Sequence, residues 1–183
     1  TGGIAEPLAA RLRETGGEPL IAPPDITTAQ GWTGVLDQAR AQGQLRRIIH
    51  AGGIGVDPAA IRSQALEGLL ALGQALSASQ APVELVIVGE NIQDVASDDP
   101  VPAQSALLLA PALVLPPECP WISCRLIDVP ADDPVRTADR LLAEIHDPRG
   151  DRLVAYRRHR RWVRDFQPLE ITSRVSATAP GPL

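Results

Sequence analysis

The run Val-Glu-Leu-Val-Ile-Val at positions 83–88 constrains the fold more than any other segment of the chain. It is rich in β-branched residues and is bounded by Pro82 and Gly89, which is typical of a strand buried on both faces of a parallel sheet. Parallel strands need long crossover connections, and these are usually helices. We therefore expect the segments on either side of this run to be helices that lead to further strands.

Helical and extended patterns do alternate along most of the chain. Apolar residues at helical spacing predict helices near residues 4–15, 28–42, 58–79, 103–115 and 135–146. Short apolar runs predict strands at 19–22, 48–51, 83–88 and 122–129, and a terminal hairpin over 153–164. This order predicts an α/β fold: a truncated, Rossmann-like, mostly parallel sheet flanked by helices, with a C-terminal β-hairpin.

Local signals indicate where two of these helices begin. Thr27 or Thr28 can cap the second helix, because a threonine oxygen can accept a hydrogen bond from a free amide of the first turn. Asp57 can cap the third, since Pro58 follows it at the first helical position.

The two ends of the sequence suggest a piece of a longer polypeptide. Thr1-Gly2-Gly3 resembles the glycine turn that normally follows a first strand, and no strand precedes it. Beyond Pro168 the sequence becomes rich in Ser, Thr, Ala, Pro and Gly, as linkers are. We therefore expect one folded unit over residues 1–168 and a linker over 169–183.

Composition argues against two classes of partner. The net charge is −5, whereas a nucleic-acid-binding protein usually has a basic surplus, and the cluster of arginines at 157–161 is local. The apolar stretches are shorter than the ~20 residues of a membrane-spanning helix, and no basic, apolar signal segment opens the sequence. We expect a cytoplasmic protein without nucleic-acid or membrane partners.

The chain lacks the residues of several catalytic mechanisms. All 17 basic residues are arginine, so no lysine is available for a Schiff base, a P-loop or a Tyr-x-x-x-Lys reductase site. The only tyrosine, Tyr156, has Arg160 four residues on, and an arginine does not titrate usefully. We therefore predict no catalytic residues, and we interpret Tyr156 as a packing residue of the hairpin.

Cofactor and metal sites are also not predicted. The turn at residues 1–7 has two glycines followed by Ala, Glu and Pro, so it lacks the third glycine of a dinucleotide loop and adds a negative charge. His50-Ala51-Gly52-Gly53 resembles a strand end that shapes a cofactor floor, but it also suits a strand end that simply needs small residues. The histidines at 50, 146 and 159 show no metal-ligand spacing, and Cys119 and Cys124 are interpreted as buried thiols.

One loop leaves two interpretations open. Asn91, Gln93 and Asp94 follow the central strand, at the end of a parallel sheet where open α/β folds bind ligands. These residues could therefore hold a ligand, or they could anchor the loop by hydrogen bonds.

Several short motifs, in order, resemble one family. Asn-Ile-Gln-Asp-Val at 91–95 is followed by Pro-Pro-Glu-Cys-Pro at 116–120, by Cys-Arg-Leu-Ile-Asp-Val at 124–129, and by Val-Ala-Tyr-Arg and Arg-Arg-Trp-Val near the end. Over residues 2–169 this order resembles the structural subdomain of ketoreductase domains in type I modular polyketide synthases. The sequence departs from that pattern in the missing first strand and in Arg158-His159 at the hairpin turn, where glycines are common.

The resemblance implies a scaffold and not an enzyme. In that family a truncated N-terminal half binds no cofactor and supports a C-terminal half that binds NADPH and carries a Ser–Tyr–Lys site. The partners implied are other domains of the same synthase, above all that catalytic half, against which Trp162 and Phe166 are expected to dock. Three alternatives remain: a pseudo-ketoreductase in a module without reduction, a fragment of an active NADPH-dependent β-ketoacyl reductase, and a stand-alone α/β ligand-binding module.

Overall fold

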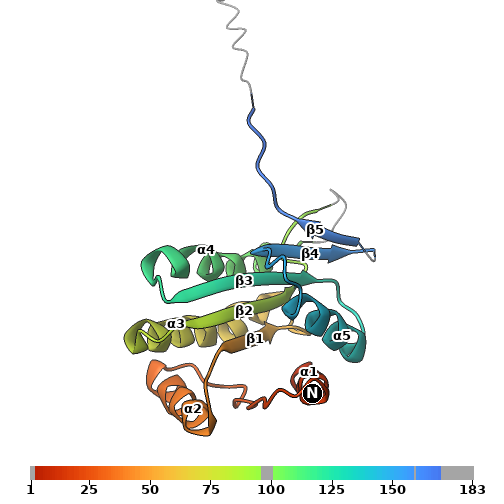
Figure 1. Cartoon of the computed structure of the whole chain (residues 1–183). Helices are drawn as coiled ribbons and strands as arrows, with labels where there is room; N and C mark the ends of the chain where they lie inside the picture. The colour runs from red at the N-terminus through yellow and green to blue at the C-terminus, as the bar shows by residue number, and fades with distance from the viewer. Residues whose placement is uncertain (1–2, 96–100, 159, 170–183) are drawn as a thin grey trace, which may run out of the picture.

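The structure is a computed structural model, and it describes residues 3–95, 101–158 and 160–169. A five-stranded sheet forms its centre, with the strands in chain order β1-β2-β3-β4-β5 (Figure 1). The strands are β1 (Arg47–Gly53), β2 (Val83–Glu90), β3 (Ile122–Val129), β4 (Leu153–Arg157) and β5 (Arg160–Val163). The first four are parallel and β5 is antiparallel to β4, so the predicted sheet and its terminal hairpin are confirmed.

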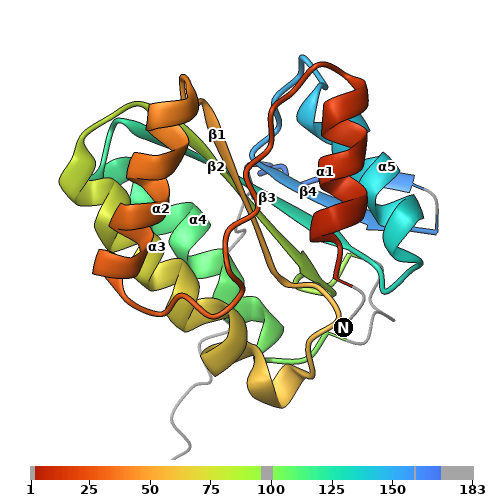
Figure 2. The ribbon, with the colours of Figure 1, turned by 90° about the horizontal axis from the view of Figure 1, so that it is seen from below.

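Helices cover both faces of the sheet (Figure 2). One face carries α2 (Ala29–Gln42), α3 (Glu67–Ser79) and α4 (Leu109–Glu118), and the other carries α1 (Ala5–Glu14) and α5 (Pro134–Ile145). Short irregular turns lead into two of these helices: a 3₁₀ turn (Pro58–Ala60) and a π-helical turn (Arg62–Leu66) before α3, and a 3₁₀ turn (Ser105–Leu108) before α4. In the described residues no helix is both long enough and apolar enough to span a bilayer.

The predicted caps are present. The Thr28 hydroxyl accepts a hydrogen bond from the amide of Gly31 at 3.2 Å, and α2 begins at Ala29, directly after Thr28. The carboxylate of Asp57 accepts one from the amide of Ala59 at 2.8 Å, with Pro58 at the first position of the 3₁₀ turn. The helix predicted from residue 58 therefore begins with irregular turns and becomes an α-helix only at Glu67.

The alternation of side chains along β2 divides the core into two layers. Leu85 and Ile87 belong to the cluster that packs on α3 and α4. Val86 and Val88 belong to the cluster that packs on α1 and α5. All four side chains are fully buried, which is why the sequence of this strand is apolar on both faces.

The strand predicted at residues 19–22 is wrong. This segment connects α1 to α2 without strand structure, and Leu20 and Ile21 are 37% and 38% exposed. A segment becomes a strand only when it pairs with a neighbour, and β1, the edge strand of the described sheet, pairs with β2 and not with this segment. The expectations for Thr1, Gly2, His159 and residues 170–183 concern positions outside the described residues.

The connection from β3 to β4 is unusual. The crossovers β1–α3–β2 and β2–α4–β3 place their helices on one face, whereas β3–α5–β4 places its helix on the other, although the strand order continues in the same direction (Figures 1 and 2). The third crossover therefore has the opposite hand to the first two. Since about 98% of such connections share one hand, specific contacts must hold this one in place.

Candidate functional site

The carboxyl ends of the parallel strands are the first place to look for a ligand site. Open α/β sheets bind ligands outside these ends, at the point where the strand order reverses direction. Over the residues that the structure describes, the order runs from β1 to β5 without reversal. This part of the sheet therefore lacks the diverging loops that form such a crevice.

The space above the ends of β1 and β2 is filled by the chain itself. A Cβ atom at Gly53 would lie 2.5 Å from Cδ1 of Leu108, and one at Gly89 would lie 2.9 Å from Cδ1 of both Leu108 and Ile92. Leu108 is fully buried and Ile92 is 2% exposed. The glycines here make room for two apolar side chains of the core.

His50 has a similar packing role on β1. A Cβ at Gly52 would lie 2.9 Å from the imidazole of His50, so the ring rests against the glycine. Burial lowers the pKa of His50 to about 4, because the charged form would be poorly solvated. His50 is therefore neutral at pH 7.

Of the predicted loop residues, Gln93 is anchored through its backbone. Its amide donates to the carboxylate of Asp128, on β3, at 2.8 Å, and its carbonyl accepts from Arg157, on β4, at 2.8 Å. Asn91 lies at the start of this turn with a left-handed backbone (φ +50°), and its amide donates to the carbonyl of Val129. For Gln93 these bonds favour the loop-anchoring interpretation.

Asp128 and Arg157 complete this anchor by pairing with each other. Their side chains lie 2.8 Å apart, and they are 0% and 6% exposed. Burial raises the pKa of Asp128, while the bonds from Arg157 lower it. Both residues belong to motifs on which the family resemblance rests. They are 29 positions apart, so their spacing in the sequence did not predict that they form an ion pair.

Tyr156 takes part in a second buried cluster, which surrounds Glu144 of α5. The Tyr156 hydroxyl donates to one carboxylate oxygen at 2.5 Å, Arg125 donates to the other at 2.6 Å, and Arg161 contacts both. Burial and the bond to Glu144 raise the pKa of Tyr156 to about 12. Tyr156 is thus a half-buried hydrogen-bond donor beside α5.

Trp162 and Phe166 lie on the outer side of the hairpin and beyond it. Trp162 stands opposite Ala155 in the β4–β5 ladder and is 40% exposed. Phe166 is 80% exposed, with the Arg164 guanidinium 5.0 Å from its ring centre. Neither side chain is buried by the described part of the chain, so both are available to a partner.

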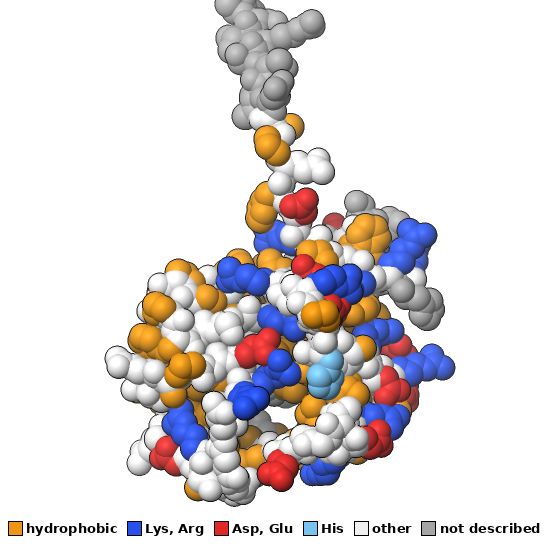
Figure 3. Space-filling model, in the orientation of Figure 1, with side chains coloured by type: hydrophobic (Ala, Val, Ile, Leu, Met, Phe, Trp, Pro, Cys, Tyr) orange, Lys and Arg blue, Asp and Glu red, His pale blue; other side chains and the backbone are white. Residues whose placement is uncertain are grey.

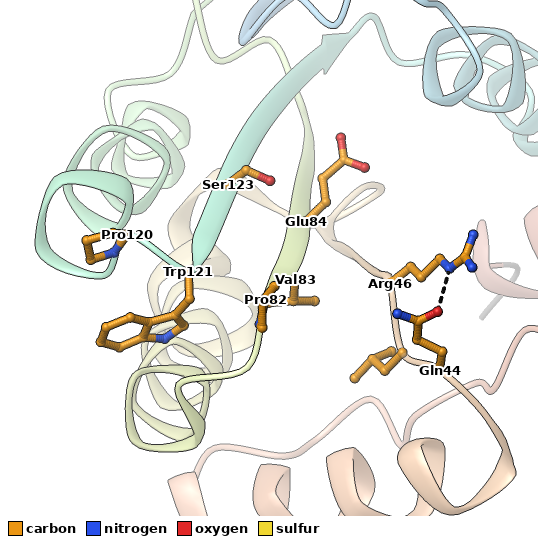
Figure 4. A pocket seen from close by; sticks show the side chains of 9 residues that line it. Gln44, Arg46, Pro82, Val83, Glu84, Pro120, Trp121 and Ser123 are labelled. Atoms are coloured by element: carbon orange, nitrogen blue, oxygen red, sulfur yellow. Dashed lines mark hydrogen bonds between the residues drawn. The ribbon is translucent and has the colours of Figure 1, made fainter.

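A shallow hollow lies at the amino ends of the parallel strands, opposite the carboxyl ends described above (Figure 4). It has a volume of about 460 Å³ and lies where β1, β2 and β3 begin. Its lining includes Arg46, Glu84, Trp121 and Ser123. The hollow lies at the other end of the strands from the loop at 91–94, and its lining comes from three segments that are separate in the sequence.

Metal-binding groups are not brought together. Among the described residues there is no cluster of three His, Cys, Asp or Glu side chains that could hold an ion. Cys119 and Cys124 are both buried, as predicted. Burial raises the pKa of Cys124 to about 11, which keeps it in the unreactive thiol form.

Comparison with known proteins identifies this architecture. No family model and no curated protein matches the chain. Among solved structures, the first ketoreductase of the tylosin polyketide synthase matches with a TM-score of 0.71 and 20% identity over 89% of this chain. A keto acid-selecting NRPS module that contains adenylation, ketoreductase and pseudo-Asub parts matches with a TM-score of 0.70 and 16% identity, also over 89%.

The match covers only part of each solved structure. The chain spans 35% of the tylosin ketoreductase and 16% of the NRPS module. The resemblance predicted from the motifs is confirmed at the level of fold: this chain has the Rossmann-like α/β fold found within synthase ketoreductases.

Proposed function

We propose that this chain is a non-catalytic structural subdomain of a ketoreductase region in a polyketide synthase. In this proposal residues 1–168 form the subdomain and residues 169–183 form a linker to a further domain. The partners are domains of the same synthase, above all a catalytic half that binds NADPH. A cytoplasmic location follows from the same assignment.

The observation that carries the proposal is the filled carboxyl edge of the sheet. The buried side chains of Leu108 and Ile92 pack against Gly53 and Gly89 at the carboxyl ends of β1 and β2, where an open α/β sheet would receive a ligand. A bound dinucleotide would also need a reversal of strand order, which the described strands do not have. Both features support a sheet that serves as a support and not as a cofactor platform.

The surroundings of Tyr156 support the same assignment. A reductase tyrosine donates a proton to substrate and depends on a lysine that lowers its pKa. Tyr156 donates to the buried carboxylate of Glu144, and its pKa is raised to about 12. The sequence contains no lysine that could reverse this shift.

Titration calorimetry of the 183-residue chain tests the non-catalytic assignment. We expect no binding heat with NADPH, NADH or adenine nucleotides. Saturable heat with a dissociation constant in the micromolar range would instead support a ligand-binding module. NADPH-dependent reduction of a β-ketoacyl thioester by this chain alone would make it a reductase.

The docking role of the hairpin needs a separate measurement. In a polypeptide that carries this chain together with the catalytic half, Trp162→Ala should lower the melting temperature, because the exposed indole would lose its partner. Val135→Ala, which removes methyl groups from a residue 47% exposed on α5, is the matched control. An unchanged melting temperature for Trp162→Ala would exclude this docking role.

A further inference from the structure

The hollow at the amino ends of the strands continues into a second one. The first hollow lies at the starts of β1, β2 and β3, and the second, of about 440 Å³, lies at the starts of β2, β3 and β4. Glu84, Pro120 and Ser123 line both hollows, so the two form one elongated depression across the first four strands. We call this depression the amino-end groove.

One face of the sheet forms the polar side of the amino-end groove. Arg47, Glu84 and Ser123 are neighbours in the register of β1, β2 and β3, so their side chains share the face on which α1 and α5 pack. The two helices cover that face further along the strands, where Val86 and Val88 are buried. Arg47 and Ser123 remain exposed, and Glu84 and Ser123 point to the same side of the sheet (Figure 4). The first row of this face is therefore open to a ligand.

The amino-end groove is positively charged. Its charged lining residues are Arg46, Arg125 and Arg152, against one carboxylate, that of Glu84. Arg47 donates to this carboxylate, and Arg125 lies 3.9 Å from it, so its charge is balanced. Several basic side chains lie close together near the centre of the space-filling view, beside a hollow (Figure 3).

The arginines at the two ends of the groove differ from the one between them. Arg125 is buried and donates to Glu144 at 2.6 Å, so it is fixed in the wall. Arg46 and Arg152 are exposed, and neither has a carboxylate partner within the part of the chain that the structure describes. Arg46 donates only to the side-chain oxygen of Gln44, at 3.1 Å. Both guanidinium groups can therefore turn toward an anionic ligand.

Between these two arginines the groove has an apolar wall. Pro82, Pro116, Pro120 and Trp121 line it. The indole NH of Trp121 donates to the carbonyl of Leu76 at 3.1 Å, which holds the ring in place. A ligand that fills the groove would need an apolar group against this wall and an anionic group at each end.

We propose that the amino-end groove binds an extended polypeptide segment that carries two carboxylates, one for Arg46 and one for Arg152. A guanidinium group pairs with a carboxylate through two parallel hydrogen bonds. Small ligands bury most of their surface in closed pockets, so a shallow, elongated groove suits a chain better than a compact molecule. The groove lies at the end of the sheet opposite the filled carboxyl edge, and this inference does not depend on the ketoreductase assignment.

The strand spacing predicts how far apart the two carboxylates should be. Arg46 directly precedes β1 and Arg152 directly precedes β4, and these strands are three strand spacings, or ~14 Å, apart. An extended chain covers this distance in about four residues. Because alternate side chains share a face, carboxylates at positions i and i+4 would both face the groove, with the side chain at i+2 against the apolar wall.

Peptide titrations of the isotope-labelled 183-residue chain, followed by NMR, test this spacing. The probe is Gly-Glu-Ala-Leu-Ala-Glu-Gly with blocked ends, and Gly-Glu-Ala-Leu-Glu-Ala-Gly has the same composition with the carboxylates three positions apart. The probe should shift the amides of Glu84 and Ser123, at the amino ends of the strands, and not those of Gly53 and Gly89, at the carboxyl ends. It should bind about two- to fivefold more tightly than the second peptide, which loses one exposed ion pair.

Charge reversal tests the two arginines directly. Arg46→Glu combined with Arg152→Glu should lower the affinity for the probe at least about tenfold, because two attractions become repulsions. Arg62→Glu combined with Arg158→Glu is the matched control, since it changes the net charge equally in the connections that follow β1 and β4. The control should lower the affinity less than about twofold, because salt screens distant charges. All four side chains are exposed, so circular dichroism should show unchanged folding.

Three results would overturn the inference: no shift of the Glu84 and Ser123 amides with the probe, equal affinity for the two peptides, or equal losses in the two pairs of variants. If the charge-reversed chain failed to fold, the comparison of the two peptides on the unchanged chain would still decide. Inorganic phosphate tests a simpler occupant. If phosphate shifted the same amides and displaced the probe at an equal or lower concentration, the groove would be a site for small anions and not for a polypeptide segment.

Discussion

The carboxylate of Glu144, on α5, lies 2.6 Å from the guanidinium of Arg125, on β3, and the two side chains are 0% and 6% exposed. This ion pair joins the strand before the unusual crossover to the helix within it. Arg161 of β5 approaches the same carboxylate at 2.8 Å, so the hairpin that follows is tied to the same point. The three residues hold α5 on a face of the sheet that the ordinary hand of the crossover would not select.

Removal of this buried charge should destabilise the chain strongly. Glu144→Gln would leave Arg125 buried without its closest counter-charge, and breaking a buried pair in this way costs about 3–5 kcal/mol. Urea unfolding followed by circular dichroism should show this loss. Glu118→Gln, at an exposed position at the end of α4, should change the free energy of unfolding by less than about 0.5 kcal/mol. Equal effects of the two substitutions would contradict the role given to Glu144.

The turn after β2 should open when its anchor on β3 is removed. Asp128→Ala removes the acceptor of the Gln93 amide and the partner of Arg157, so the Gln93 amide should exchange with solvent faster than in the unchanged chain. Asp128→Asn keeps an acceptor oxygen and should give an intermediate rate. Hydrogen exchange by NMR measures this, with the Val86 amide in the centre of β2 as internal reference. A Gln93 rate that changes no more than that of Val86 would show that the turn is held by other contacts.

Two glycine substitutions should change the free energy of unfolding in opposite directions. Gly53→Ala forces its Cβ against Leu108 and against the backbone of Gly89, and overpacking of this kind costs about 1–3 kcal/mol. Gly34→Ala, in α2, meets no atom within 4 Å and should stabilise the chain by about 0.5–1 kcal/mol through helix propensity. Thermal unfolding distinguishes the two signs.

The cause of the first effect can be checked with a double substitution. If the Leu108 side chain is the obstacle, Gly53→Ala should cost less in a Leu108→Ala background than in the unchanged chain. An equal cost in both backgrounds would place the clash elsewhere.

His50 should make stability depend on pH in a defined window. Its pKa is about 4 in the folded chain and about 6.5 when exposed, so between these values the unfolded chain binds more protons. Stability should therefore fall as the pH is lowered from 6.5 to 4, with a slope from this one group of up to about 1.4 kcal/mol per pH unit. Denaturant unfolding at several pH values should show that His50→Asn flattens this dependence.

The control for the pH measurement is a substitution that changes no titratable group. Gly34→Ala, which meets no atom within 4 Å, should leave the dependence on pH as it is in the unchanged chain. A dependence that His50→Asn does not alter would mean that other groups cause it.

The sequence by itself determined most of the secondary structure, because these signals are local. The apolar run at 83–88 and the run from Ile122 to Val129 predict β2 and β3 without knowledge of their neighbours, since a buried strand must be apolar along its length. Thr27 or Thr28 predicts the start of α2, and Asp57 that of the 3₁₀ turn before α3, because a capping side chain bonds only to its own first turn. The ordered motifs also predicted the ketoreductase-like fold that the solved structures share.

Only the tertiary structure decided which distant residues meet. The segment at 19–22 has the composition of a strand, but it does not pair with β1, the edge strand of the described sheet, so a correct local pattern led to a wrong prediction. The pairing of Asp128 with Arg157 joins residues 29 positions apart, and that of Arg125 with Glu144 joins residues 19 apart. Neither pairing follows from spacing along the chain, because each depends on the face of the sheet that α5 covers and on the register of β4 beside β3.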